Sequence, residues 1–372
     1  MEKQIFTFGK PAEGESFTDR EAESARLSAN FRCGINTFLL SPRRWGKTSL
    51  VQKVMREVRS TGLQVVFVDV FKCKTALEFS ETVAAAVLAQ TSTKTEEFIE
   101  NAKKFLGRLN VGLSLSPDPI NSMDIRFGIT PGKDDIHSAL ELAGRISESK
   151  GIKIVVCIDE FQQIAEFDDS LTFQKELRTI WQHQPNVSYC LFGSKKHMME
   201  ALFDDETKPF YKFGDIIYLK RIPLNYWVEF IMKKFSDVGK IITEDAIRRI
   251  CETVEYHSSY VQQLSWYVFV YSSKVVDSQS IDMAVNELVA QNTALFESKT
   301  ESIPAYQMNF LRAVADGIHK GFSSSAVVSK YRLGSSANVV ALKRTLLDKN
   351  LIFIEDGMVY LADPVLGIWL MR

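Results

Sequence analysis

The chain has 372 residues, 45% of them apolar, which is enough to bury the cores of two or three domains. Its 45 basic and 46 acidic residues give a net charge of -1. No overall field therefore drives the chain onto nucleic acid or an anionic membrane, and any such contact needs a local patch. The composition is that of an ordinary globular protein without internal repeats or low-complexity tracts.

The cysteines and the first residues indicate a cytoplasmic protein. Five scattered cysteines, an odd number, fit buried free thiols in a reducing compartment better than a disulfide framework. The opening MEKQIFTFGKPAEGE lacks the apolar core of a secretion signal. The longest apolar runs, such as LSWYVFVY from Leu264, are far shorter than the roughly 20 residues that span a bilayer. We expect a soluble protein without membrane contacts.

Residues 1–222 alternate short apolar strands with helical patterns. Unalternated apolar runs predict strands at 35–40, 63–70, 152–161, 186–194 and from 214 onward. Apolar spacing predicts helices directly after the first strand, from Ala76 and from Ser170. Such strands between helices are typical of a parallel sheet covered on both faces, so the sequence predicts an α/β fold with five parallel strands.

Residues 91–135 are longer than an α/β connection needs and predict an insertion. A charged helical pattern covers 94–106. The alternating runs NVGLSLS and MDIRFGI predict a hairpin added at the edge of the sheet.

The rest of the chain predicts two further domains. Residues 223–297 read as helices that start near Leu224, Thr243, Ser258 and Ser280, and SKTESIP, 298–304, reads as a polar linker. Residues 304–372 predict helices over 305–316, 323–331 and 336–349, followed by a hairpin with Asp356-Gly357 at its turn. Three helices and a hairpin predict a winged helix-turn-helix.

The stretch FLLSPRRWGKTSLV, 38–51, resembles a phosphate-binding loop in which Ser41 replaces the usual first glycine. A helix start carries unpaired N–H groups and partial positive charge, so a tight turn into it cradles phosphate oxygens. Lys47 can reach the β and γ phosphates, and the Thr48 hydroxyl can ligate Mg²⁺. The residues predicted to contact a nucleotide here are Pro42, Arg43, Arg44, Trp45, Gly46, Lys47, Thr48 and Ser49. The alternative, a plain helix start, is disfavoured by the strand before it and the acids downstream.

Those acids are Asp159 and Glu160 in IVVCIDEF, at the carboxyl end of the third predicted strand. Ligands of open α/β sheets bind at such ends. Asp159 is predicted to hold the Mg²⁺, and Glu160 to polarise the water that attacks the γ-phosphate. The alternative for Glu160 is a helix N-cap.

The fourth strand ends in Gly193-Ser194, and Ser194 is predicted to sense the γ-phosphate as part of the catalytic set. Capping of the next helix is nearly as well supported. Hydrolysis also needs positive charge on the transition state. The sequence leaves the candidates open: Arg43, Arg44, Arg178, Lys195, Lys208 and Lys212.

Several motifs in order give the chain a family resemblance. They are FTDREAE (17–23), LLSPRRWGKTSL, VVCIDEFQQI, LFGSKKHMMEALF, PFYKFGDIIYLKRIP, HSSYVQQL and DPVLGIWL. Over most of its length the chain resembles AAA+-type P-loop ATPases of the archaeal and bacterial ATP-binding protein family. This group is close to the STAND signalling ATPases and more distant from origin-recognition ATPases.

The resemblance implies an ASCE sheet of order 5-1-4-3-2, a helical lid and a C-terminal winged helix. It places Phe17 and Arg20 near the base of ATP or ADP, and Ser194 at the sensor-1 position. Relatives often carry an arginine where this chain has Lys208 and Lys212, and His-Pro where it has His257-Ser258. At Ser41, the neighbouring Pro42 restricts φ and replaces the freedom of glycine.

Two functions follow. The first is a slow Mg²⁺-dependent ATPase that acts as a switch: ATP binds between sheet and lid, and the winged helix reports to a protein partner or a second copy of the chain. The alternative is a DNA-associated ATPase in which 336–349 enters the major groove. Its basic residues would be Lys330, Arg332, Lys343, Arg344 and Lys349. A degenerate nucleotide binder without turnover is disfavoured, because Lys47, Thr48, Asp159 and Glu160 occur together.

Overall fold

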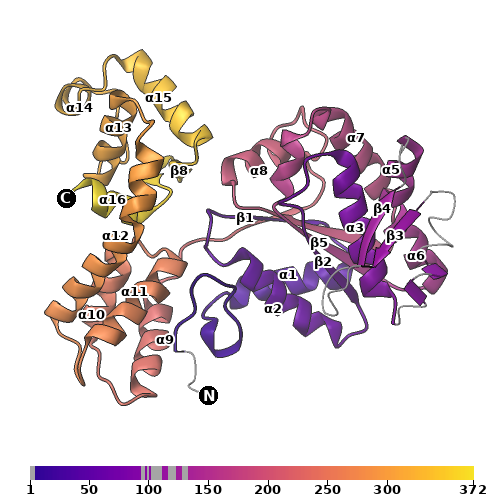
Figure 1. Cartoon of the computed structure of the whole chain (residues 1–372), viewed down its shortest axis with the longest axis horizontal. Coiled ribbons are helices and arrows are strands. Elements are labelled where there is room, and N and C mark those ends of the chain that lie inside the picture. Colours follow the sequence, from indigo (N-terminus) through magenta and orange to yellow (C-terminus); the bar gives the residue numbers. More distant parts are fainter. Residues whose placement is uncertain (1–4, 94–96, 99, 102–110, 116–122, 128–132) are drawn as a thin grey trace. The chain divides into compact units, whose positions relative to one another are not determined.

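The computed structural model in Figure 1 describes residues 5–93, 97–98, 100–101, 111–115, 123–127 and 133–372. The chain divides into two compact units. The sheet unit comprises Arg20–Ser41 and Lys47–Leu219. The helical unit comprises Met1–Asp19, Pro42–Gly46 and Lys220–Arg372. The division between them therefore falls twice at the loop that the sequence singles out, after Ser41 and after Gly46.

The sheet unit is built on five parallel strands. They are β1 (Thr37–Leu40), β2 (Gln64–Asp69), β5 (Ile154–Asp159), β6 (Val187–Phe192) and β7 (Asp215–Tyr218). Their order is β2-β5-β6-β1-β7. If these five strands are renumbered 1 to 5 along the chain and the order is read from the β7 edge, it becomes 5-1-4-3-2. The predicted parallel sheet and the order implied by the resemblance are both confirmed.

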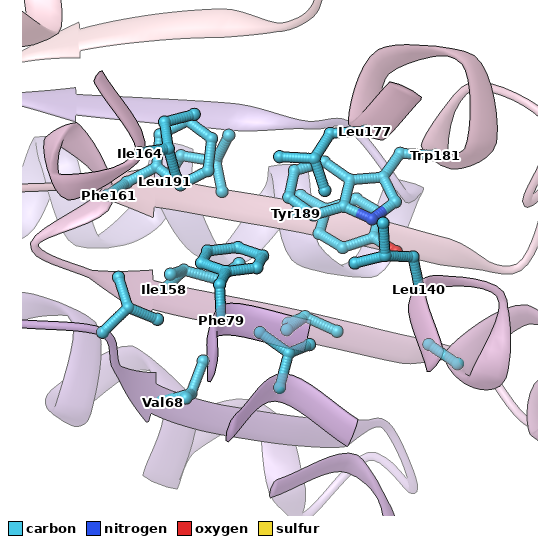
Figure 2. Close-up of a cluster of buried hydrophobic side chains, with 14 of the residues drawn as sticks. Val68, Phe79, Leu140, Ile158, Phe161, Ile164, Leu177, Trp181, Tyr189 and Leu191 are labelled. Atoms are coloured by element: carbon cyan, nitrogen blue, oxygen red, sulfur yellow. The ribbon is translucent and has the colours of Figure 1, made fainter. Parts of the chain in front are cut away.

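Successive residues of the strands point to opposite faces, and both faces are buried. In β1, Phe38 is 1% exposed and Leu39 is 0% exposed. The helices of this unit include α1 (Glu21–Cys33), α2 (Lys47–Arg59), α3 (Ala76–Thr91), α5 (Lys133–Leu140), α6 (Leu142–Lys150), α7 (Ser170–Trp181) and α8 (Lys196–Phe203). The 3-10 helix η2 (Phe161–Glu166) follows β5 directly. Figure 2 shows side chains of α3, α7 and η2 gathered against Ile158, Tyr189 and Leu191 of the strands.

The insertion holds a hairpin, as predicted, but its position was predicted wrongly. Strands β3 (Val111–Leu115) and β4 (Met123–Phe127) are antiparallel. In the described residues they form a two-stranded sheet of their own, while β2 and β7 are the edges of the five-stranded sheet. The pair satisfies its ladder internally, so it needs no place on the larger sheet. The helix predicted over 94–106 falls largely outside the described residues.

The helical unit contains the four predicted helices α9 (Leu224–Ser236), α10 (Glu244–Thr253), α11 (Ser258–Tyr271) and α12 (Ser278–Thr300). Helix α12 continues into the segment 298–304, so the first part of that predicted linker is helical. The reason is burial: Phe296 is 0% and Thr300 8% exposed, and the Thr300 hydroxyl donates to the Phe296 carbonyl at 2.7 Å.

The last part of the chain is a winged helix, as predicted. It contains α13 (Ala305–Ala315), α14 (Ser325–Tyr331), α15 (Ser336–Asp348), β8 (Ile352–Glu355) and β9 (Met358–Leu361). The turn residues Asp356 and Gly357 have φ of 49° and 73°, the left-handed pair of a tight hairpin. The sequence did not predict the final helix, α16 (Pro364–Leu370).

The five cysteines all lie in the described part and are free thiols, and all but Cys33 are buried. No helix in the described part is long and apolar enough to cross a bilayer.

Candidate functional site

The loop between β1 and α2 has the backbone of an anion-binding turn. Gly46 has φ of 95° and Arg44 has φ of 63°, so left-handed residues alternate with ordinary ones just before the helix. Backbone N–H groups in such a run point toward one concavity. Ser41 has negative φ, which any residue adopts, so the position where the common pattern has glycine does not require glycine here.

The amine of Lys47 is held by the residue that replaces this glycine. Its Nζ donates to the carbonyl of Ser41 at 2.9 Å and to the Ser41 hydroxyl at 3.2 Å. Lys47 is only 6% exposed. Ser41 therefore holds the amine of Lys47 at the start of the loop.

Thr48 and Asp159 lie together, as the sequence reading required. The Thr48 hydroxyl donates to Oδ2 of Asp159 at 2.8 Å, and the backbone N–H of Glu160 donates to Oδ1 at 2.8 Å. Burial raises the pKa of Asp159 to about 6, against the lowering effect of the Thr48 hydrogen bond. A hydroxyl and a partly buried carboxylate are the hard oxygen donors that Mg²⁺ takes from a protein when phosphates and water complete its shell.

Glu160 has a backbone conformation that is uncommon for its residue type, with φ of 57°. Non-glycine residues in this region cost roughly 1–3 kcal/mol and are found most often at functional sites. Glu160 stands at the N-cap of η2, but its side chain makes no capping hydrogen bond. Glu160 is therefore the N-cap residue, as the alternative predicted, but its carboxylate does not cap the helix through a hydrogen bond.

Ser194 also has a different partner from the one that capping would give. The N-cap of α8 is Lys195, and the Ser194 hydroxyl donates to Oε2 of Glu160 at 2.8 Å. The Ser194 backbone N–H reaches the same oxygen at 3.2 Å. The structure thus brings the two predicted catalytic residues into direct contact.

Within the helical unit, loop residue Trp45 packs against the winged helix. Its ring meets that of Phe353 edge to face at 6.1 Å, and the guanidinium of Arg221 lies 5.6 Å from the Trp45 ring centroid. The same guanidinium lies 4.5 Å from the ring of Tyr360 and pairs with Glu355 at 3.3 Å. Trp45 is 3% exposed. One arginine therefore joins the loop to both strands of the wing.

The start of α11 also approaches the loop. His257 is 6% exposed, and burial lowers its pKa to about 4, with the positive charge of Arg44 acting in the same direction. One turn later, the Tyr260 hydroxyl donates to Asp363 at 2.8 Å, just before α16. The neutral form of His257 is the one present at neutral pH.

The two residues implied for the adenine pocket fall on opposite sides of the division between the units. Phe17 belongs to the helical unit, where Gln262 of α11 donates to the neighbouring Ser16 carbonyl at 3.2 Å. Arg20 belongs to the sheet unit, is 3% exposed and pairs with Glu23 at 3.1 Å. Their contact with a base stays a prediction.

Several of the candidate cations have structural partners. Arg178 stacks on the Phe213 ring at 4.4 Å, and burial lowers its pKa. Lys195 pairs with Glu166 at 2.6 Å, and Lys212 lies 5.1 Å from the Tyr211 ring centroid. Arg43 and Arg44 are exposed. The loop arginines are therefore more exposed than Arg178 and Lys195, although the Arg44 side chain also donates to the Tyr260 hydroxyl.

Sequence reasoning missed two residues of this region, Gln162 and Arg221. Gln162 donates to Oε2 of Glu160 at 2.5 Å. The sequence feature that could have indicated Gln162 is a polar residue in the motif FQQI, which begins with Phe161 and ends with Ile164. Arg221 had no signal, because an arginine after a strand is common on protein surfaces.

These features define a class. A five-stranded parallel sheet with the loop between β1 and α2, acids at the end of β5, a helical region and a winged helix make a P-loop ATPase fold of the AAA+-like type. Residues 17–254, more than half of the chain, match the family described as "ATPase domain predominantly from Archaea", and the chain belongs to this family. Residues 294–372 match the family described as "probable winged helix domain".

Solved structures share this fold at low sequence identity. A Walker-type ATPase of Pyrococcus abyssi aligns with a TM-score of 0.68 at 19% identity, over 99% of this chain and 100% of that one. The ORC2 protein of Aeropyrum pernix, in ADPNP and ADP complexes, aligns with a TM-score of 0.60 at 13% identity, over 99% and 95%. The ORC1 protein of Aeropyrum pernix in complex with DNA aligns with a TM-score of 0.51 at 12% identity, over 96% and 93%. No curated protein is similar enough to add to these comparisons.

Proposed function

We propose that this protein is a slow Mg²⁺-dependent ATPase that works as a nucleotide-driven switch and signals through its helical lid and winged helix to a protein partner. The observation that carries the proposal is the place of Trp45. This residue of the phosphate-binding loop is buried against Phe353 of the wing and Arg221. The loop that we propose to hold phosphates therefore contacts the element that would report their presence.

The proposed chemistry uses the residues of the loop and of the end of β5. Lys47 would leave Ser41 to contact the β and γ phosphates, since its amine already lies at the loop. Thr48 and Asp159 would hold Mg²⁺, whose charge offsets that of the phosphates. Glu160 would take a proton from the attacking water, and Ser194, in contact with it, completes the set. The loop residues Pro42 to Ser49, Phe17 and Arg20 would bind ATP or ADP.

We expect turnover to be slow because several of the basic side chains that could stabilise the transition state are already bound to other residues. A transition-state arginine raises phosphoryl-transfer rates by about 10³–10⁵-fold. Arg178 and Lys195 are engaged with Phe213 and Glu166, and the Arg44 side chain donates to the Tyr260 hydroxyl, so several of the candidate cations are already held by partners. A slow reset suits a switch, because the ATP-bound form must persist long enough to be read.

Hydrolysis is tested by measuring phosphate release from ATP with Mg²⁺ and with EDTA. Glu160→Gln should keep nucleotide binding and lower the rate by about 10²–10⁴-fold, the range for a general base. Glu166→Gln is the matched control, since Glu166 lies in the same η2 but pairs with Lys195 on the surface. Equal rates for wild type and Glu160→Gln would contradict the proposed base.

The switch is tested by hydrogen exchange of the full chain in the ADP-bound and ATP-bound states, with Glu160→Gln to hold the ATP form. We expect the exchange of β8 and β9 to differ between the two states, because Phe353 and Tyr360 share Arg221 with Trp45. Helix α10 is the internal control. Identical exchange in the wing with either nucleotide would contradict signalling by this route.

A DNA-associated function is the second candidate, and the exposed Arg344 of α15 supports it. Against it, Lys330 pairs with Asp316 at 2.8 Å and Lys349 with Gln307 at 3.0 Å. The outward face of α15 also carries Val340, which is 68% exposed and suits a protein surface better than a phosphate backbone. The test is anisotropy with labelled duplex DNA at several salt concentrations. Salt-dependent binding that is lost in Lys343→Ala with Arg344→Ala would favour DNA over a protein partner.

A further inference from the structure

Gln162 is a polar residue at a buried position. It is 2% exposed in η2, between Phe161 and Ile164, which are both fully buried. Figure 2 shows these two apolar side chains in the core, close to Leu191, so they anchor the short helix that carries Gln162. The amide of Gln162 is thus held at a fixed place beside the site.

That amide satisfies only half of its hydrogen bonding. Nε2 donates to Oε2 of Glu160 at 2.5 Å, while Oε1 is buried and has no partner among the described residues. A buried acceptor without a donor destabilises the folded state. A side chain retained at this cost is better explained by its contact with Glu160 than by stability.

The chain also provides space for this contact. A Cβ at Gly193 would lie 1.7 Å from Oε1 of Gln162, much closer than any real contact. Gly193 does not have positive φ, so close approach rather than backbone conformation requires glycine there. Gly193, directly after β6, and Gln162 in η2 therefore fit closely against each other.

Three donors meet on one oxygen of Glu160. Oε2 accepts from Gln162 Nε2 at 2.5 Å, the Ser194 hydroxyl at 2.8 Å and the Ser194 N–H at 3.2 Å. These donors fix the rotation of the carboxylate. Within the described residues, Oε1 of Glu160 is the oxygen left to accept a proton.

We propose that Gln162 is a positioning residue that, together with Ser194 and the space at Gly193, fixes Oε2 of Glu160 and so presents Oε1 to the attacking water. The inference rests on the proposed ATP hydrolysis. In that step the water oxygen bonds to the γ phosphorus, its proton passes to Oε1, and the bond from that phosphorus to the bridging oxygen breaks with its electron pair leaving on ADP.

The test compares Gln162→Leu and Gly193→Ala with wild type and with Gln163→Leu, the matched control. Gln163 is adjacent but pairs with Glu166 on the surface at 2.9 Å. We expect kcat to fall by about 10- to 100-fold in both test variants, since small misplacements of a catalytic group have effects of this size. KM for ATP should stay within about twofold, because the contact serves the base and not the nucleotide. Gln163→Leu should match wild type.

Two further measurements, the melting temperature and the rate in a Glu160→Gln background, distinguish a positioning role of Gln162 from a structural one. Gln162→Leu should not lower the melting temperature, because it removes an unpaired buried acceptor. In a Glu160→Gln background it should cause no additional loss of rate, because the group it positions is already gone. A lower melting temperature together with an added loss in that background would overturn the inference.

The outcomes also separate this inference from the proposed function. Wild type that releases no phosphate from ATP would overturn both. Wild type that turns over ATP while Gln162→Leu and Gly193→Ala keep its kcat would overturn the positioning role alone.

Discussion

Replacing Gly46 by alanine should weaken nucleotide binding through backbone strain alone. Gly46 has φ of 95°, and a Cβ at this position would meet no other atom within 4 Å, so the effect is conformational and not steric crowding. A non-glycine residue in this region costs about 1–3 kcal/mol. In the free protein the chain can relax at Gly46, which is only partly buried, so the cost returns when the loop must adopt this conformation around phosphates.

At about 1.4 kcal/mol for each factor of ten, this strain raises the Kd for Mg-ADP by about 5- to 150-fold. Isothermal titration with ADP measures the change without interference from hydrolysis. Gly151→Ala is the matched control: Gly151 has φ of 63° at the end of α6 and also has open space around its Cβ. Its strain should appear in the melting temperature and not in the Kd. An unchanged Kd for Gly46→Ala, or an equal rise for Gly151→Ala, would refute the reasoning.

Three further changes test the site and the two units. Thr48→Ala should raise the Mg²⁺ concentration for half-maximal ATP turnover by about 10- to 100-fold, while Thr48→Ser, which keeps the hydroxyl that meets Asp159 at 2.8 Å, should stay near wild type. Thr243→Ala removes the cap that accepts from Ala246 N–H at 3.2 Å and should cost about 1 kcal/mol in urea unfolding, unlike Thr253→Ala in the same helix. Phe310→Ala should cost about 3–5 kcal/mol, seen as faster hydrogen exchange in α13 and β9, because the ring is fully buried and stacks on Phe322 at 4.4 Å. Unchanged exchange there would contradict the assigned core.

The fold was predictable because its signals are local. Unalternated runs such as IVVCID predict buried parallel strands, and Asp356-Gly357 between alternating runs predicts the wing. The strand order came from the family resemblance and not from the runs themselves. The hairpin at 111–127 was assigned to the wrong sheet, because a strand's own residues do not state which edge it pairs with.

The site was predictable only in part, for the same reason. Lys47 and Thr48 are adjacent at the start of α2, and Asp159 ends a recognisable strand. The contact of Ser194 with Glu160 joins residues 34 positions apart, and it depends on the register between β5 and β6. Gln162 lies in a 3-10 helix too short to give a periodic signal, and the meaning of Gly193 appears only when the Gln162 amide is seen beside it.

The division of the chain inside the phosphate-binding loop bears on how the protein can be dissected. Pro42–Gly46 cluster with the helical unit, whereas Lys47 onward belongs to the sheet unit. A fragment that ends after β7 would keep Lys47, Thr48 and Asp159 but would lack the wing. The indole of Trp45, which packs against Phe353 in the full chain, would then be exposed to water. In a fragment limited to the ATPase domain, the loop would therefore lack part of its packing. Weaker nucleotide binding by such a fragment would not be evidence against nucleotide binding by the intact chain.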